Sequence, residues 1–115
     1  MKNIKIVEEV TFRKAATPEE GMPIYEKIIS FLEKGEAIRL DFQQVELVTT
    51  AFLNVMIGRL YEKYTSEQLN KSISFLNLRP EITSRIKAVS ETAKNYYKNQ
   101  EQYNRDIEST LYGDN

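Results

Sequence analysis

Three short segments of the chain alternate apolar and polar side chains with a period of two residues. The segments lie near residues 3–8, 37–42 and 72–76. In the second of them, Ile38 and Leu40 alternate with Arg39 and Asp41. Successive side chains of a β-strand point to opposite faces, so each segment is predicted to be a strand with one buried face and one wetter face.

Between these predicted strands lie stretches of helical character, which gives the order strand, helix, strand, helix, strand, helix. Connections of this length allow the strands to be parallel neighbours. Parallel strands that are covered on both faces read as continuous apolar runs, whereas these segments alternate. The pattern therefore predicts an α/β fold with a small mixed or parallel sheet and helices mainly on one face.

The first helix carries signals for both of its ends. Residues 17–20 (TPEE) have the form of a capping box with proline at the first helical position. Pro23 lacks the backbone N–H that a helix begun at residue 17 would need there. We therefore expect a turn over residues 17–21, a main helix from about Met22, and a left-handed cap at Gly35.

The second helix, predicted over residues 50–64, is unusually apolar. Its apolar side chains cover well over half of its circumference, which places it between the sheet and neighbouring helices. These side chains are Ala51, Phe52, Leu53, Val55, Met56, Ile57 and Leu60. Only Asn54, Gly58 and Glu62 form a wet stripe, at spacings of four residues. The start of such a buried helix must emerge at an exposed loop.

The third helix follows Pro80 and has apolar residues at spacings of three and four. These residues are Ile82, Ile86, Val89, Ala93 and Tyr96. From Lys94 onward the composition shifts toward Asn, Gln, Tyr and Lys, and the helical period weakens. We therefore divide the chain into a domain over residues 1–98 and a polar extension over residues 99–115, which is either helical or frayed.

The residue composition limits the chemistry of the chain. Its 115 residues include no His and no Cys, which removes imidazole bases, thiol nucleophiles and the ligands that zinc prefers. No glycine-rich phosphate loop is present, and no clustered acids predict a calcium or magnesium site. We expect no catalytic residue, no metal and no cofactor. Asp41, at the end of a predicted strand, is expected to hydrogen-bond loop amides rather than to act as a catalytic acid.

Charge and hydropathy limit the partners. The 16 Lys and Arg residues nearly balance the 17 Asp and Glu residues, so nothing indicates nucleic-acid binding. No apolar run approaches the roughly 20 residues that span a bilayer, and the N-terminal residues lack the apolar core of a signal peptide. We expect a protein of the cytoplasm that binds neither nucleic acid nor membrane. The sequence leaves its oligomeric state open.

An apolar strand ending in Asp41, a loop through Val45, a hydroxyl-rich turn and a downstream Gly58 follow one another in residues 37–64. These features resemble the core of a STAS domain, the domain of sulfate transporters and anti-sigma factor antagonists. A family of small bacterial STAS-like proteins of unknown function is more similar still, in its Asp-Phe after the strand and its Ile-Gly-x-Leu-Tyr run. The resemblance implies a STAS-like fold and a non-enzymatic regulatory role in which the domain docks a signalling protein.

In anti-sigma factor antagonists the turn holds a serine that a partner kinase phosphorylates, and in sequence register this serine falls on Thr50. The resemblance therefore makes Thr50 the candidate phosphoacceptor. The turn departs from the family pattern, because Thr49 replaces an acid, Ala51 a hydroxyl residue and Phe52 a glycine. Helix capping is the simpler interpretation of the two threonines, since a threonine hydroxyl accepts an N–H of the first turn. Both roles are compatible if Thr49 caps the helix and Thr50 is exposed.

The leading hypothesis is a module that binds a protein partner, which by the resemblance is a histidine-kinase-like ATPase or another signalling protein. The predicted contact residues lie in the loop, at the helix start and on the wet stripe: Gln43, Gln44, Glu46, Thr49, Thr50, Asn54 and Gly58. The alternative is a small-molecule or anion-binding module, in which the same helix start holds a phosphate or a nucleotide.

Overall fold

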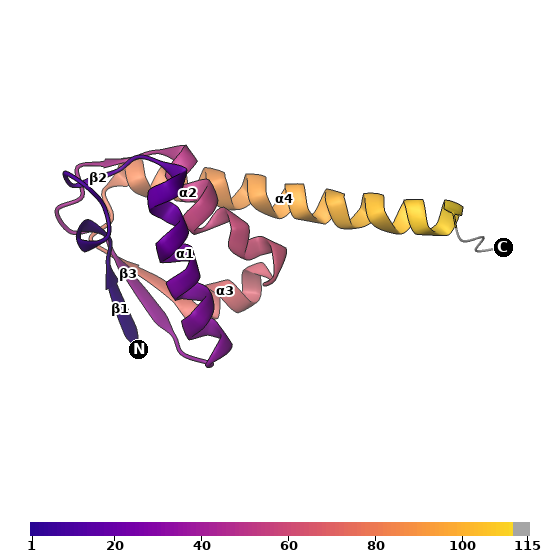
Figure 1. Cartoon of the computed structure of the whole chain (residues 1–115), viewed down its shortest axis with the longest axis horizontal. Helices are drawn as coiled ribbons and strands as arrows, with labels where there is room; N and C mark the ends of the chain where they lie inside the picture. Colours follow the sequence, from indigo (N-terminus) through magenta and orange to yellow (C-terminus); the bar gives the residue numbers. More distant parts are fainter. Residues whose placement is uncertain (112–115) are drawn as a thin grey trace.

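The three predicted strands form one parallel sheet in the computed structural model, which describes the backbone of residues 1–111 and the side chains of residues 1–99. The strands are β1 (Lys2–Lys5), β3 (Ile38–Asp41) and β5 (Ile73–Leu76), in the spatial order β1-β3-β5 (Figure 1). The register aligns Ile4, Leu40 and Phe75 in one row across the sheet. The predicted strands are thus confirmed, and the sheet is parallel throughout.

The first strand is shorter than the alternating segment that predicted it. After Lys5 the chain leaves the sheet through a 3₁₀ turn, η1 (Ile6–Glu8). A second, two-stranded parallel sheet, which was not predicted, joins β2 (Lys14–Ala15) to β4 (Leu47–Val48). A two-residue strand is too short to show a period of two, so only the packing of the chain reveals it.

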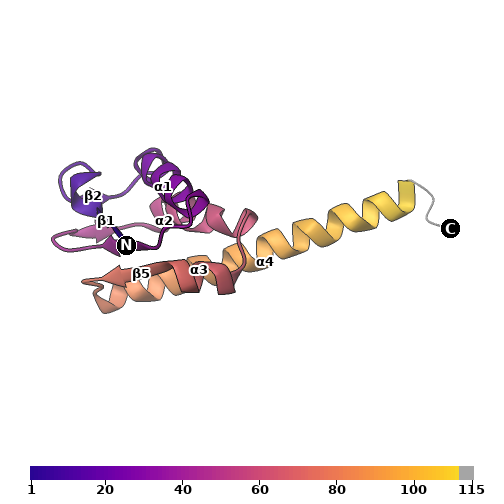
Figure 2. The same ribbon diagram turned by 90° about the horizontal axis from the view of Figure 1, so that it is seen from below.

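The four α-helices of residues 1–111 lie on one side of the three-stranded sheet (Figures 1 and 2). On that side Ile4, Ile38 and Leu40 are buried in the core. On the opposite side Lys5 and Ser74 are exposed. The α/β layer with helices on one face, predicted from the alternation of the strands, is confirmed.

Helix α1 (Pro18–Glu33) is one continuous element, so the predicted start at Met22 after a separate turn was wrong. Thr17 caps the helix as expected, with its Oγ1 atom accepting an amide of the first turn at 3.2 Å. Pro23 lies inside the helix, where the carbonyl of Glu19 loses its intrahelical partner. Both of these residues are exposed, so water can replace the lost hydrogen bond.

The end of α1 follows the prediction. Gly35 has a φ angle of +74°, and the amide of Glu36 donates to the carbonyl of Phe31 at 2.9 Å. This is the left-handed cap that glycine adopts without a steric penalty from a Cβ atom.

The predicted second helix consists of two different elements. They are helix α2 (Thr50–Met56) and a 3₁₀ segment, η2 (Gly58–Glu62). The single helix expected over residues 50–64 was therefore wrong beyond Met56. The expected burial is confirmed for Phe52, Leu53, Met56, Ile57 and Leu60, whereas Ala51 is exposed and Val55 is half-buried.

A further short helix, α3 (Ser66–Ser72), was not predicted. Thr65 and Gln68 form its capping box, in which the Thr65 hydroxyl accepts the Gln68 amide at 3.1 Å and the Gln68 side chain accepts the Thr65 amide at 2.8 Å. The sequence carries this signal, but α3 buries only Leu69 and shows no apolar period.

Helix α4 (Pro80–Leu111) begins where the sequence predicted and buries the first four of its predicted apolar residues. Tyr96 was expected to continue this buried face, but it is 59% exposed. Its neighbour Tyr97 is half-buried instead. Tyr97, rather than Tyr96, thus continues the buried face of the helix.

The second half of α4 projects from the body of the molecule (Figure 1). The helix crosses the predicted boundary at residue 98 as one element, and residues 112–115 of the predicted extension lie outside the described residues. The radius of gyration is 16.0 Å. A compact chain of this length would have a value of about 13 Å, so the projecting helix accounts for the difference. No helix of residues 1–111 is both long and apolar enough to cross a membrane.

Helices α1 and α2 cross in direct backbone contact. Gly21 of α1 is buried at the crossing, and a Cβ atom on it would lie 2.9 Å from the carbonyl oxygen of Phe52 and 3.4 Å from the amide nitrogen of Met56. A contact of 2.9 Å is too short for a Cβ atom, so any other residue would push the two helices apart.

We expect Gly21→Ala to lower the free energy of unfolding by about 1–3 kcal/mol, because overpacking at this contact forces the helices apart. Gly58→Ala is the matched control, since a Cβ atom at Gly58 would lie at an ordinary contact distance, 3.6 Å from the nearest atom of Val89. Its free energy of unfolding should stay within about 1 kcal/mol of wild type. Urea unfolding followed by circular dichroism measures both variants, and equal losses would contradict the close crossing at Gly21.

Candidate partner-binding site

The loops that follow β3 and β5 meet at one edge of the molecule. In open sheets of parallel strands, ligands bind in the crevice at the carboxyl ends of the strands. Here these two loops and Arg13 line an open cavity of about 320 Å³. We use the name loop edge for residues 12–13, 42–46, 49–50, 54 and 77–79.

Asp41, the last residue of β3, orders both loops. Its Oδ1 atom accepts the side-chain amide of Asn77 at 2.7 Å and the backbone amide of Gln43 at 2.9 Å. These hydrogen bonds, the one from Asn77 first, lower the pKa of the Asp41 carboxyl below its ordinary value of 3.8. Burial opposes this shift, and the charge of Lys5 adds to it. The predicted hydrogen bonding of Asp41 to loop amides is confirmed.

Four non-glycine residues of the described chain have a left-handed backbone, and all four belong to the loop edge. Their φ angles are 54° at Phe12, 58° at Arg13, 65° at Gln44 and 58° at Asn77. For residues other than glycine and asparagine this conformation costs roughly 1–2 kcal/mol, so surrounding contacts must enforce it at Phe12, Arg13 and Gln44. Backbone strain of this kind clusters at functional sites.

Phe12 and Arg13 form the tip of a tight turn that the sequence analysis missed. The Lys14 amide donates to the Thr11 carbonyl at 3.0 Å, and the Glu46 amide donates to the Arg13 carbonyl at 2.8 Å. Phe12 is 85% exposed, more than any other large apolar side chain of residues 1–99. The turn contains no Gly, Asn or Asp, so no sequence signal indicates it.

The two threonines have different environments. Thr49 is half-buried, and its Oγ1 atom accepts the Phe52 amide at 3.1 Å and donates to the Ala16 carbonyl at 2.7 Å. Its own amide donates to the Ala15 carbonyl at 3.0 Å. Thr49 is therefore the cap of α2 and ties it to the segment before α1. Thr50, the first residue of the helix, is exposed.

Two arginines fix the strand that leads into α2. Arg79 donates from Nη2 to the carbonyl of Glu46 at 2.9 Å, and Arg85 donates from Nη1 to the carbonyl of Val48. These bonds hold the residue before β4 and the last residue of β4. The approach to Thr49 is thus anchored by side chains that lie more than 30 residues further along the chain.

Three of the predicted contact residues come together at the cavity of the loop edge. Gln43, Gln44 and Glu46 are exposed beside it. Asn54 is exposed on α2, one turn after the exposed Thr50. Together with the half-buried Thr49, these residues form one continuous stretch of the chain from β3 into α2.

Gly58 is the exception among the predicted contact residues. It is buried beneath α4, against Val89 and Ala93, so its predicted place in an exposed stripe was wrong. The spacing of four residues keeps side chains on one face only while the helix is α-helical. Because the α-helix ends at Met56, Gly58 is turned away from the face that carries Asn54.

Hydrogen bonding and charge are the chemistry available at the loop edge. Within the described residues, no group of three or more His, Cys, Asp or Glu side chains could hold a metal ion. The polar side chains around the cavity are instead the amides of Gln43, Gln44 and Asn77, the carboxylate of Glu46 and the guanidinium groups of Arg13 and Arg79. Such a set suits the recognition of polar groups on another molecule.

The family model of the STAS-like domain of unknown function (DUF4325) matches residues 20–83, which is more than half of the chain. The match extends from the first turn of α1 to the first turn of α4 and includes the loop after β3 and the start of α2. It does not include the turn at Phe12. No curated protein and no solved structure matches the chain significantly.

Thr49→Ala should lower the free energy of unfolding by about 1–3 kcal/mol, because the Phe52 amide and the Ala16 carbonyl both lose a partner. Thr50→Ala is the matched control and should change it by less than about 0.5 kcal/mol. Thr49→Ser retains the hydroxyl and should recover most of the loss. Chemical unfolding measures the three variants, and a larger loss at Thr50 than at Thr49 would reverse the assignment of the cap.

The lowered pKa of Asp41 makes its contribution to stability depend on pH. The contribution is present above the unfolded-state pKa, near 3.8, and is lost as the pH falls from there through the lower folded-state pKa. We expect Asp41→Asn to be less stable than wild type at neutral pH and the difference to shrink below about pH 4. Unfolding free energies measured stepwise from pH 7 to acid test this, and a difference independent of pH would contradict a role for the charge.

Proposed function

The chain belongs to the family of STAS-like domains of unknown function, and from that membership we propose that it is a non-enzymatic regulatory module that binds a signalling protein. The proposed binding surface is the loop edge. Its contact residues are Gln43, Gln44, Glu46, Thr50 and Asn54, with Phe12 as an anchor. The resemblance to anti-sigma factor antagonists suggests that the partner is a histidine-kinase-like ATPase or another signalling protein.

The observation that carries the proposal is the exposure of Phe12 on a strained turn. A large aromatic side chain in water gains nothing for folding, and the left-handed backbone beneath it is unfavourable for a residue other than glycine. Aromatic side chains and arginine are enriched at protein–protein interfaces, and Phe12 is followed by Arg13. Burial of Phe12 in a partner would remove its apolar surface from water and would thereby contribute to the free energy of binding.

The order of the loop edge also supports docking. Asp41 links the loop after β3 to Asn77, and Glu46 links the same loop to Arg13 and Arg79. A surface that is held in one conformation before binding loses less conformational entropy when a partner binds. These hydrogen bonds therefore serve affinity as well as stability.

The charges around Phe12 indicate what the partner surface looks like. Arg13 and Lys14 are exposed, and neither forms an ion pair within the described side chains. Complementary charge steers association and fixes the register of an interface. We therefore propose a partner with an apolar pocket for Phe12 and acidic residues opposite Arg13 and Lys14. The carboxylates of Glu20 and Glu46 lie beside the same turn and would face polar or basic groups of the partner.

Phosphorylation of Thr50 is a separate part of the proposal. The side chain is exposed at the first position of α2, so a kinase can reach its hydroxyl. A phosphate there would carry a charge of about −2 and would place that charge in the proposed interface. Phosphorylation would therefore weaken binding.

Anion binding at the same helix start has less support. Helix α2 has only seven residues, and the Phe52 amide in its first turn already donates a hydrogen bond to the Thr49 hydroxyl. A phosphate at this site would compete with the Thr49 hydroxyl for the Phe52 amide and so would oppose the cap that joins α2 to Ala16. A protein partner can bind the exposed side chains without disturbing that cap.

We expect Phe12→Ser to weaken partner binding about tenfold or more, because truncating an interface anchor costs at least 1–2 kcal/mol. Tyr96→Ser is the matched control, since Tyr96 is an exposed aromatic about 24 Å along α4 from Pro80. Thr50→Ala should bind as wild type does, and Thr50→Glu should bind more weakly. Tagged protein from its native cells identifies the partner by mass spectrometry, and calorimetry with the purified pair gives the affinities.

The outcomes distinguish the role of Phe12 in the interface from the role of Thr50 as a phosphorylation site. Wild-type affinity in Phe12→Ser would remove Phe12 from the interface. Equal affinity of Thr50→Ala and Thr50→Glu, with no phosphorylated form in the intact mass of protein from native cells, would leave Thr50 as a helix-start residue. A partner that binds all four variants equally would place the interface elsewhere on the molecule.

A further inference from the structure

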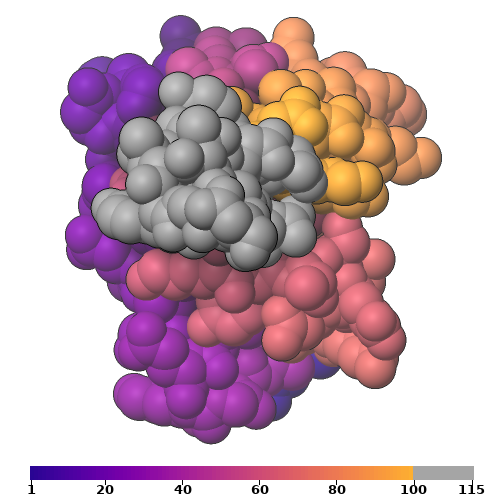
Figure 3. All heavy atoms as spheres, turned by 90° about the vertical axis from the view of Figure 1, so that its right-hand side faces the viewer, coloured from indigo at the N-terminus to yellow at the C-terminus, as the bar shows by residue number. Residues whose placement is uncertain are grey.

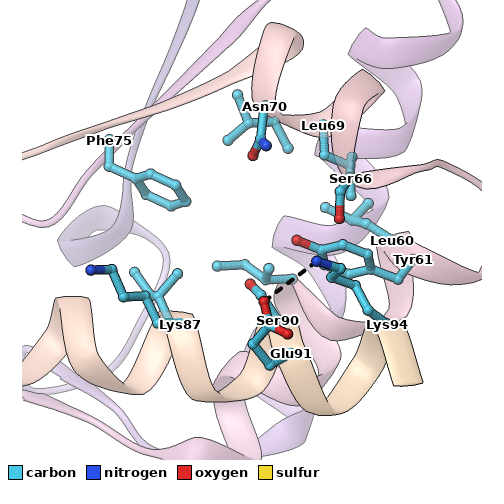
Figure 4. Close-up of a pocket in the computed structure, with 13 residues that line it drawn as sticks. Leu60, Tyr61, Ser66, Leu69, Asn70, Phe75, Lys87, Ser90, Glu91 and Lys94 are labelled. Carbon is cyan, nitrogen blue, oxygen red and sulfur yellow. Dashed lines mark hydrogen bonds and ion pairs between the residues drawn. The ribbon is translucent and has the colours of Figure 1, made fainter. Parts of the chain in front are cut away.

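A groove lies between β5 and α4, although these elements follow one another in the chain. Helix α4 packs on η2 and α2 rather than on β5, with Val89 and Ala93 resting over Gly58. Ile73 and Phe75, which face the covered side of the sheet, are consequently only half-buried. The groove has a volume of about 450 Å³, and α3 borders its other side (Figure 4). In Figure 3 the pink surface around α3 and the orange surface of α4 lie next to each other.

The size and floor of the groove suit a small molecule. Its floor consists of Ile57, Leu60, Leu69, Ile73, Phe75 and Ile86. Pockets of about 300–1,000 Å³ with mostly apolar walls are typical of small-molecule sites. Along α4 the groove extends from Ile86 to Lys94, which is only about 12 Å of helix. A stable protein interface needs about 800 Å² from each partner, more than a groove of this length offers.

Hydrogen-bond donors gather at one end of the groove. Figure 4 shows the polar ends of Lys94, Tyr61 and Ser66 directed toward one another there. The ammonium group of Lys94 lies 3.4 Å from a carboxylate oxygen of Glu91, whose side chain is 69% exposed. A carboxylate of the protein itself thus occupies this end, in an exposed pair that is weakly held.

The charges along the groove favour an anion. Its charged side chains are Lys87, Glu91 and Lys94, which leaves an excess of one positive charge. No charged side chain of α3, η2 or β5 lines the groove. A ligand carboxylate at Lys94 would therefore meet only one repulsive group, the displaceable Glu91.

We propose that this groove binds a small amphipathic monoanion, with its carboxylate at Lys94 in place of Glu91 and its apolar chain or ring along the floor toward Phe75. A doubly charged phosphate fits less well, because the apolar floor would remove its water without supplying hydrogen bonds. The groove shares no lining residue with the cavity of the loop edge. The site is thus separate from the proposed partner-binding surface and does not depend on it.

Octanoate is the probe, titrated into ¹⁵N-labelled full-length protein below the concentration at which it forms micelles. Saturable changes in the amide resonances should centre on Leu69, Phe75 and Glu91. Octanoate should bind about tenfold more tightly than hexanoate, because two further methylene groups are buried. 1-Octanol, which lacks the charge, should bind more weakly than octanoate.

Two variants at the Lys94 end of the groove should change the affinity for octanoate in opposite directions. Lys94→Met retains the apolar stem but removes the charge, and should weaken octanoate binding about tenfold. Glu91→Gln removes the competing carboxylate and should tighten binding about two- to fivefold. The matched controls are Lys98→Met, one turn further along α4, and Glu67→Gln, which removes an acid paired with Lys71 outside the groove. Neither control should change the affinity.

Weaker binding in Lys94→Met together with tighter binding in Glu91→Gln would support the site. Wild-type affinity in both variants would overturn it, as would resonance changes confined to the loop edge or the absence of saturation at millimolar octanoate. Unchanged amide resonances outside the groove establish that each variant folds. The conservative Glu91→Gln variant keeps the test decisive if Lys94→Met fails to fold.

Discussion

The backbone contact between α1 and α2 at Gly21 determines where the loop edge lies. With no side chain between the two helices at this point, α2 cannot shift along α1 without moving the Phe52 carbonyl into its neighbour. The bond from Thr49 to the Ala16 carbonyl then fixes the start of α2 against the segment before α1. The exposed position of Thr50 follows from these two contacts, because the hydroxyl one residue earlier is committed to holding the helices together.

The parts of the fold that could be predicted are those that local patterns decide. Ile38 alternates with polar neighbours because one face of the sheet lacks cover, and Gly35 ends α1 through a conformation that few other residues adopt. The predictions were wrong where a contact with a distant part of the chain, or access to solvent, determines the local structure. Pro23 is tolerated because the carbonyl it leaves free is exposed, and Gly58 is covered because α4 packs on the 3₁₀ segment. Helix α3 has seven residues and buries only Leu69, so it is too short to show an apolar period.

The residues of the loop edge also include some that local patterns predict and some that only distant contacts determine. Gln43 and Gln44 could be predicted because they lie between the end of a strand and the start of a buried helix, and the cap because threonine is a preferred residue there. Phe12 could not, since its turn has no turn-forming residue and is held by an amide from a loop far along the chain. Asn77 could not either, because its bond to Asp41 spans 36 residues. No local pattern encodes contacts of that range.

The wholly parallel pairing of the strands has a consequence for the speed of folding. Lys2 pairs with Ile38, and Ile38 pairs with Ile73, so no hairpin between neighbouring segments can nucleate the main sheet. Each pairing closes a loop of about 35 residues, and the entropy of that closure is lost before the first ladder bond compensates for it. Until both pairings form, the edges of all three strands are open to other chains. The molecule is therefore expected to fold more slowly than a helical bundle of equal length, and to be most prone to aggregation while it is being made.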